Sequence, residues 1–152
     1  DAWLPARQAT DVSVVNSISV TGGAQNSEMW SDDYDASAER AAAENRPVFI
    51  DFTGYTCTNC RAMESTVFPL ENIQERFSQM ELVKLYTDGG SGARENQQFQ
   101  FELTGTVALP TYAIVNPENG TVLDQLIGFT KAENFEAFLD RGIERYRNSV
   151  SP

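Results

Sequence analysis

The stretch PVFIDFTGYTCTNCRAMESTVF, residues 47–68, decides how this chain is interpreted. Its apolar run over residues 48–52 ends at a polar turn, residues 53–56, and Cys57 and Cys60 follow directly. A short apolar run bounded by turn residues is typical of a buried strand. The stretch therefore predicts a strand, a turn and then a helix whose first turn carries both cysteines.

Cys57 and Cys60 are the only 2 cysteines, and the sequence contains no histidine. A scaffold of structural disulfides needs more cysteines at wider spacing. A tetrahedral zinc site needs four ligands, and neither histidine nor a second cysteine pair is present to complete one. The lack of histidine also excludes Cys-His and Ser-His-Asp catalysis. Dithiol-disulfide chemistry is the main chemistry left to this pair.

The length and net charge of the chain limit which classes of partner it can have. The chain has 152 residues, of which 41% are hydrophobic, so one globular domain with its own core is expected. Its formal net charge of -11 repels nucleic-acid phosphates and anionic lipid surfaces. No apolar run approaches the roughly 20 residues that cross a bilayer. We therefore expect protein or small neutral partners, no nucleic acid, and no insertion of this segment into a membrane.

The rest of the chain alternates helix and strand signals. Helices are expected at residues 35–44, 57–68, 70–77, 95–103 and 132–147, and strands at residues 48–52, 81–87, 111–115 and 122–127. Strands joined through helices pair in parallel, whereas Asn119-Gly120 predicts an antiparallel hairpin between the last two strands. The predicted fold class is α/β, with a central mixed β-sheet flanked by helices on both faces.

Three segments are expected along the chain. Residues 1–28, rich in Ser, Thr, Gly, Ala and Asn, are interpreted as a linker or arm, residues 29–148 as the folded domain, and residues 149–152 as a tail. Because the chain begins with Asp1 rather than Met, we expect a mature form or a piece of a longer protein.

Over residues 29–147, the Cys-x-x-Cys stretch after a strand and Leu109-Pro110-Thr111 before a later strand resemble thioredoxin-fold proteins. The resemblance implies that Pro110 is the cis-proline of that fold. It also implies that Asp51 is the buried carboxylate behind the active site. In the same way Lys84 corresponds to the partner lysine and Gly128 to a glycine of the substrate-binding rim.

Within that superfamily the chain departs from the usual Trp-Cys-Gly-Pro-Cys motif. It most resembles the C-terminal periplasmic domain of the DsbD family of transmembrane thiol-disulfide reductases, which carries acidic residues at the positions of Asp51 and Glu64. The resemblance implies that the domain takes electrons from a membrane-embedded cysteine pair and passes them to a periplasmic acceptor. A periplasmic location follows, with the chain free or tethered to the inner membrane as part of a longer protein.

Chemical roles can be assigned to both cysteines. Cys57, at the start of a helix, is expected to be the nucleophile, because unpaired backbone N–H groups and the helix dipole stabilise a thiolate there. Cys60, one turn further in, is expected to be the resolving thiol that attacks the mixed disulfide. The alternative interpretation is an inert pair or a structural disulfide, which the Cys-x-x-Cys spacing after a strand disfavours.

Of the charged residues near the motif, Asp51 has one interpretation, and the other three have two each. Burial of Asp51 would raise its pKa, so that it could accept the Cys60 proton. Glu64 could share that role, or be an ordinary solvated carboxylate on a helix face. Lys84 is expected to be the counter-charge of Asp51, with a surface strand lysine as the alternative. Arg61 could hold the thiolate, although exposed basic residues are common in a first helical turn.

An apolar rim for docking a partner is predicted from Tyr55, Leu109 and Phe129, each of which could equally be ordinary packing. A cis Leu109-Pro110 bond would place the Leu109 backbone beside the cysteines, free to pair with a substrate strand. A trans proline that merely opens a strand is the alternative.

Three functions compete at this point. The leading hypothesis is a thiol-disulfide oxidoreductase acting as a protein-disulfide reductase or electron relay outside the cytoplasm, with no cofactor and no resident metal. The second is a free-standing periplasmic thioredoxin-like protein that serves cytochrome c biogenesis. The third is a non-enzymatic module in which the cysteine pair holds Cu(I), assisted by Met63.

Overall fold

A computed structural model describes residues 29–150. The interpretation of residues 1–28 as a linker or arm falls outside the described residues. None of the helices that the structure describes is long and apolar enough to cross a membrane.

Strands and helices occur in the predicted order. The strands are β1 (Trp30–Ser31), β2 (Val48–Thr53), β3 (Glu81–Tyr86), β4 (Thr111–Val115) and β5 (Val122–Ile127). The helices are α2 (Tyr34–Glu44), α3 (Thr58–Thr66), α4 (Glu71–Phe77), α5 (Ala93–Thr104) and α6 (Ala132–Val150). The two-residue strand β1 has no counterpart in the sequence prediction, and α6 continues two residues into the predicted tail.

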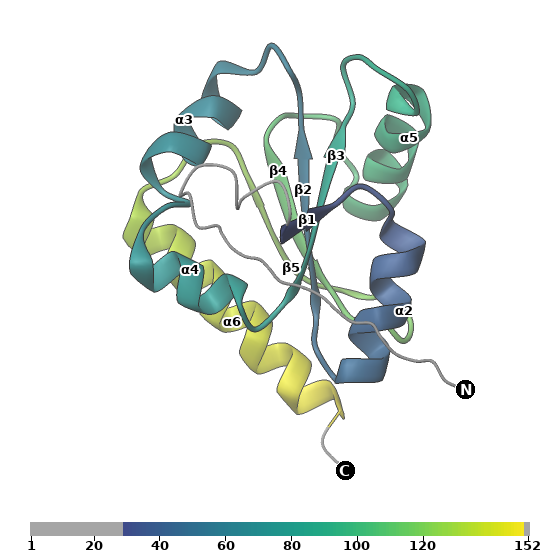
Figure 1. Ribbon diagram of the computed structural model, residues 1–152, viewed down its shortest axis with the longest axis vertical. Coiled ribbons are helices and arrows are strands. Elements are labelled where there is room, and N and C mark those ends of the chain that lie inside the picture. Colours follow the sequence, from purple (N-terminus) through teal and green to yellow (C-terminus); the bar gives the residue numbers. More distant parts are fainter. Residues whose placement is uncertain (1–28, 151–152) are drawn as a thin grey trace, which may run out of the picture. The chain divides into compact units, whose positions relative to one another are not determined.

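The strands form one mixed sheet in the order β1-β3-β2-β4-β5, which confirms the predicted α/β class (Figure 1). Strand β2 is central: it pairs in parallel with β3 and antiparallel with β4, and β4 and β5 form the expected antiparallel hairpin. Because the cysteine stretch directly follows β2, the position of the cysteines is fixed by a strand that is hydrogen-bonded to a neighbour on each side.

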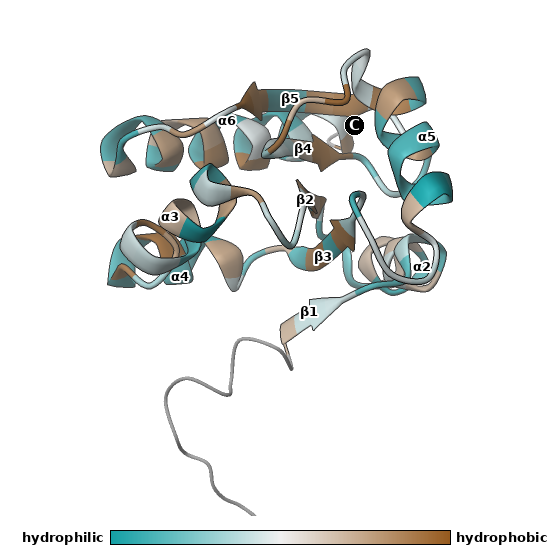
Figure 2. Cartoon of the chain, turned by 90° about the horizontal axis from the view of Figure 1, so that it is seen from above, coloured by the Kyte–Doolittle hydropathy of each residue, from teal (hydrophilic) through white to brown (hydrophobic). Residues whose placement is uncertain are grey.

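Helices cover both faces of the sheet, α2 and α5 on one and α3, α4 and α6 on the other (Figure 2). Successive side chains of β2 point to opposite faces of the sheet, because a strand is pleated. Ile50 and Phe52 belong to a hydrophobic cluster that includes Ala41 of α2. On the other face Phe49 packs against Phe77 of α4 and residues of α6. Asp51, two residues after Phe49, therefore faces the layer that contains α3.

Local sequence explains where α2 begins and ends. The Asp33 side chain accepts a hydrogen bond from the Ala36 N–H, which satisfies one of the orphan donors of the first turn. The helix ends at Asn45, which takes the left-handed conformation with φ 57°. Asparagine tolerates this conformation better than most residues, and Pro47 prevents the helix from continuing.

Candidate active site

Cys57 and Cys60 form a disulfide at the N-terminus of α3, with their Cα atoms 5.2 Å apart. Cys57 is the N-cap residue, and its Sγ accepts a hydrogen bond from the Cys60 N–H at 3.1 Å. Cys57 is partly exposed, whereas Cys60 is only 2% exposed. The outer cysteine is thus partly exposed and the inner one buried, an arrangement compatible with the two roles predicted from the sequence.

Asp51 lies in the middle of β2 and is 1% exposed. Burial raises its pKa to about 7, an effect that the nearby Glu64 carboxylate increases and that Lys84 and Arg61 oppose. Its Oδ1 accepts no hydrogen bond from any described residue. A buried carboxyl with a near-neutral pKa can both accept and return a proton at physiological pH.

Glu64 is held by two cations. Its Oε2 lies 2.9 Å from Nη2 of Arg61 and 3.8 Å from Nζ of Lys84. The same Arg61 nitrogen donates to Oγ1 of Thr53 at 3.1 Å, so Arg61 ties α3 to the end of β2. Glu64 is therefore part of a charge network rather than a freely solvated carboxylate.

Lys84 lies beside Asp51 in the β2–β3 register and lowers its pKa electrostatically. Its predicted role as counter-charge of Asp51 is thus supported by position, but the ion pair described for its ammonium group is with Glu64. The Glu64 carboxylate is partly exposed, and pairing there requires less desolvation than pairing with a fully buried group.

Leu109 and Pro110 form the loop that precedes β4, and the peptide bond between them is cis. The Pro110 carbonyl accepts a hydrogen bond from the Gly128 N–H at 2.8 Å, which brings the segment of Phe129 to this loop. Leu109 is half-buried, and its Cδ1 lies 3.0 Å from where a Cβ on Gly54 would stand. The proline loop therefore lies against the turn that carries the cysteines.

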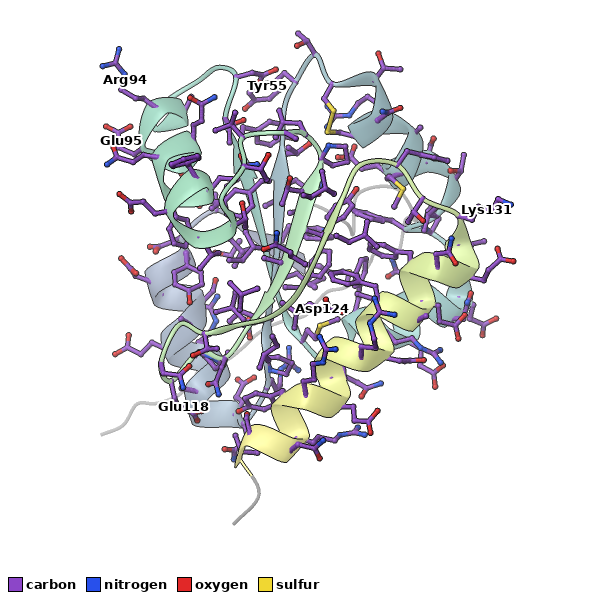
Figure 3. All side chains as sticks on the ribbon, turned by 180° about the vertical axis from the view of Figure 1, so that it is seen from behind. Tyr55, Arg94, Glu95, Glu118, Asp124 and Lys131 are labelled. Atoms are coloured by element: carbon purple, nitrogen blue, oxygen red, sulfur yellow. A yellow bond between two sulfur atoms is a disulfide. The ribbon has the colours of Figure 1, made fainter. Side chains whose placement is uncertain are left out.

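Two of the predicted rim residues are strongly exposed. Tyr55 is 57% and Phe129 is 50% exposed. The Tyr55 ring stacks on that of Tyr86, with centroids 3.9 Å apart. Figure 3 shows Tyr55 at the upper end of the sheet, between the turn before α3 and the loop before α5. Exposed aromatic side chains at this end of the sheet suit contact with another protein chain.

Gln100 and Asp88 were missed by sequence reasoning, although both touch these loops. The Gln100 side chain is fully buried, and its Nε2 donates to the Ala108 carbonyl at 2.8 Å, just before Leu109. Asp88 accepts hydrogen bonds from the turn before Cys57. The only sequence signal was a polar side chain inside a helix for Gln100, and a Thr-Asp-Gly-Gly loop for Asp88.

The thioredoxin-like domain model matches residues 34–143 of the chain. The chain belongs to the thioredoxin-like family. Domains of this family exchange disulfides with protein partners, and this chain has its Cys57–Cys60 disulfide at the start of α3. No curated protein sequence matches the chain significantly.

Solved structures similar to this thioredoxin-like domain include two from disulfide-exchange systems and one thioredoxin. The oxidised C-terminal domain of DsbD from Neisseria meningitidis shares 19% identity with a TM-score of 0.63, over 74% of this chain and 98% of that one. A thioredoxin from Thermus thermophilus shares 20% identity with a TM-score of 0.62, over 74% and 84%. A putative disulphide-isomerase from Bacteroides thetaiotaomicron shares 22% identity with a TM-score of 0.59, over 76% and 90%. These similarities show the fold.

Metal ligation was the competing use of the cysteine pair. Across residues 29–150, no group of three or more His, Cys, Asp or Glu side chains is placed to hold a metal ion. Met63, the residue considered as a further Cu(I) ligand, is fully buried in α3.

Proposed function

We propose that this thioredoxin-like domain is a thiol-disulfide oxidoreductase that works as a protein-disulfide reductase. The observation that carries the proposal is the position of the Cys57–Cys60 disulfide, with an accessible sulfur at the N-terminus of α3 and the inner sulfur shielded. A thiolate at a helix N-terminus is stabilised by the backbone N–H groups, so Cys57 is the attacking sulfur.

In the reduced enzyme, the Cys57 thiolate attacks one sulfur of a substrate disulfide. The other substrate sulfur leaves as a thiolate and takes a proton from solvent, and a mixed disulfide remains on Cys57. Cys60 then loses its proton and attacks the Cys57 sulfur, which releases the second substrate thiolate. Two electrons have passed to the substrate, and the Cys57–Cys60 disulfide has formed.

Asp51 is the group proposed to accept the Cys60 proton. The proposal is supported by its pKa of about 7, which suits a base at neutral pH, and by its burial on the face of β2 that α3 covers. Glu64 acts on this proton transfer indirectly, because its negative charge helps to raise the Asp51 pKa.

The proposed physiological setting is the periplasm, as the C-terminal domain of a DsbD-type reductase. This finer assignment is supported by the acidic pair Asp51 and Glu64 and by the fold shared with the Neisseria meningitidis DsbD domain. A membrane-embedded cysteine pair would then donate electrons to Cys57–Cys60, and a periplasmic disulfide would accept them.

Reduction of insulin disulfides, with dithiothreitol as electron source, tests the enzymatic proposal. The wild-type chain is expected to accelerate reduction, and Cys57→Ser to abolish the acceleration. Ser65→Ala, a small change at an exposed position of α3, serves as the control and retains the rate. A wild-type chain that does not accelerate reduction, or that binds Cu(I) stoichiometrically instead, contradicts the proposal.

The direction of electron flow is tested in cells. The protein is produced in the cells of its native organism, and its thiols are trapped by rapid acid quenching and alkylation. A reductase fed from the membrane is expected to hold Cys57 and Cys60 largely as the dithiol. A pair found almost entirely as the disulfide would contradict the DsbD-type assignment without affecting the insulin result.

A further inference from the structure

The carboxylate of Asp88 receives three hydrogen bonds from the two residues before Cys57. Asp88 lies in the loop between β3 and α5. Its Oδ1 accepts the Tyr55 N–H at 2.9 Å. Its Oδ2 accepts the Thr56 N–H at 3.1 Å and the Thr56 hydroxyl at 2.9 Å. One side chain thus fixes two consecutive peptide groups and a hydroxyl directly adjacent to the nucleophile.

Gly54 marks the point where three segments meet. A Cβ on Gly54 would stand 2.7 Å from Oδ2 of Asp88, closer than real Cβ contacts allow, and 3.0 Å from Cδ1 of Leu109, which is a very tight contact. The Gly54 carbonyl in turn accepts the Cys57 N–H at 3.3 Å. The absence of a side chain at Gly54 is therefore what lets the Asp88 loop and the proline loop approach the cysteine turn together.

Tyr55 is held on its other side as well. Nη1 of Arg61 donates to the Tyr55 carbonyl at 3.4 Å, so both polar groups of its backbone have charged partners. Its ring stacks on Tyr86, and the Cβ position of Gly90, in the Asp88 loop, is 3.6 Å from the Tyr55 hydroxyl. The loop after β3 therefore supports both the backbone and the ring of Tyr55, which Figure 3 shows at this end of the sheet.

We propose that Asp88 is a positioning residue, which holds the turn of residues 54–56 so that the Cys57 sulfur stays in its N-cap place at the start of α3. The proposal rests on the proposed function, because it assigns Asp88 a part in that same site. Thr56 fits the same role: its hydroxyl, at the position where thioredoxins usually carry Trp, gives the Asp88 carboxylate a third donor.

Positioning and simple electrostatics predict opposite effects on Cys57. Hydrogen bonds from Thr56 and Tyr55 lower the pKa of Asp88, so it is an anion at neutral pH. An anion near a thiol disfavours the thiolate, so removing the charge alone would lower the Cys57 pKa. Releasing the turn instead withdraws Cys57 from the N–H groups that stabilise its thiolate, which raises the pKa.

The test measures the alkylation rate of Cys57 by iodoacetamide against pH, in a Cys60→Ala background where Cys57 is the only thiol. Asp88→Ala is expected to move the midpoint of this profile upward. Thr56→Val keeps the Asp88 charge but removes one of its donors, and a smaller upward move is expected. Asp124→Ala is the matched control, because that carboxylate is also hydrogen-bonded but lies beside α6, away from Tyr55 (Figure 3).

With both cysteines present, Asp88→Ala is expected to lower kcat/KM for insulin reduction about tenfold or more, as misplacing a reacting group does. A midpoint that falls identifies Asp88 as an electrostatic group and overturns the proposal. A midpoint that stays in place while the melting temperature drops overturns it too, because the role is then merely structural. If the wild-type chain reduces no disulfide, the proposed function fails, yet the alkylation profiles still decide the role of Asp88.

Discussion

Asp51 links folding and chemistry through a single proton. An ionised carboxylate in the sheet interior loses its hydration, so the folded chain prefers the protonated form, and the pKa rises from 3.8 to about 7. The raised pKa that suits Asp51 to accept a proton therefore also means that its ionisation destabilises the folded chain. This consequence can be measured without a substrate.

The stability of the oxidised wild-type chain is expected to fall as pH rises from 4 to 8. Below pH 4 Asp51 is protonated in both states, whereas above pH 7 it is ionised in both. Between these values the unfolded chain binds fewer protons, so the free energy of unfolding decreases with pH, by up to about 4 kcal/mol in total. Asp51→Asn lacks this decrease, and urea titrations across the pH range measure the difference.

Asp51→Leu provides the comparison for that measurement. A buried amide and a buried leucine differ in packing and in hydrogen bonding, but neither titrates. As pH rises, both variants should therefore become more stable relative to the wild type. Their two curves of stability difference against pH should have the same shape and differ only by a constant. A difference that does not change between pH 4 and 8 would mean that the Asp51 pKa is not raised in the folded chain.

How far single residues could be predicted depends on how local their partners are. Cys57, Cys60 and Asp51 belong to one continuous stretch, and their arrangement follows from the strand, turn and helix that it forms. Asp88 acts on Tyr55, which is 33 residues away in the sequence. Such a contact arises from the parallel pairing of β2 with β3, which ends both strands at the same edge of the sheet.

Among the elements, α6 illustrates what a pattern predicts well and what it leaves out. Its buried positions Phe135, Phe138, Leu139, Ile143 and Tyr146 were predicted from helical spacing, and all are buried. Gly142, also buried, carries no hydrophobic signal. A Cβ there would stand 2.9 Å from Cγ2 of Ile114 in β4 and would overlap its Cδ1. The glycine therefore sets how closely α6 packs on the sheet.

Gly142→Ala is expected to destabilise the chain by up to about 2 kcal/mol. Overpacking a filled core costs about 1–3 kcal/mol, and the better helix propensity of alanine offsets up to about 1 kcal/mol. Chemical denaturation of the oxidised chain measures the change. A stabilised variant would mean that α6 moves away from β4 at little cost.

Ile114→Val offers a matched partner for this prediction, because it removes the Cδ1 that the new methyl group would meet. Alone it should cost about 0.5–1.5 kcal/mol. The double variant should lose less unfolding free energy than the sum of the two single-variant losses, because each change relieves the strain or the cavity that the other creates. Strict additivity would show that the Gly142 and Ile114 side-chain positions do not compete for the same space.

For the molecule as a whole, charge and apolar surface serve different purposes in partner choice. The chain carries 22 acidic and 11 basic residues, so its field attracts cationic and repels anionic partners at long range. The residues proposed to contact a partner at the site, Tyr55 and Phe129, are exposed and carry no charge. The field is therefore expected to control the encounter rate more than the strength of docking.

Two disulfide peptides of equal length, one flanked by lysines and one by glutamates, test this expectation. At about 10 mM ionic strength, where the Debye length is about 30 Å, the lysine peptide should be reduced about tenfold faster. At about 1 M, where the Debye length falls to about 3 Å, the two rates should converge, and an uncharged peptide should respond little to salt. Stopped-flow reaction of the pre-reduced chain isolates the thiol-disulfide step from its regeneration. Equal rates at low salt, or a faster glutamate peptide, would mean that local groups around Cys57, such as Arg61, outweigh the net charge.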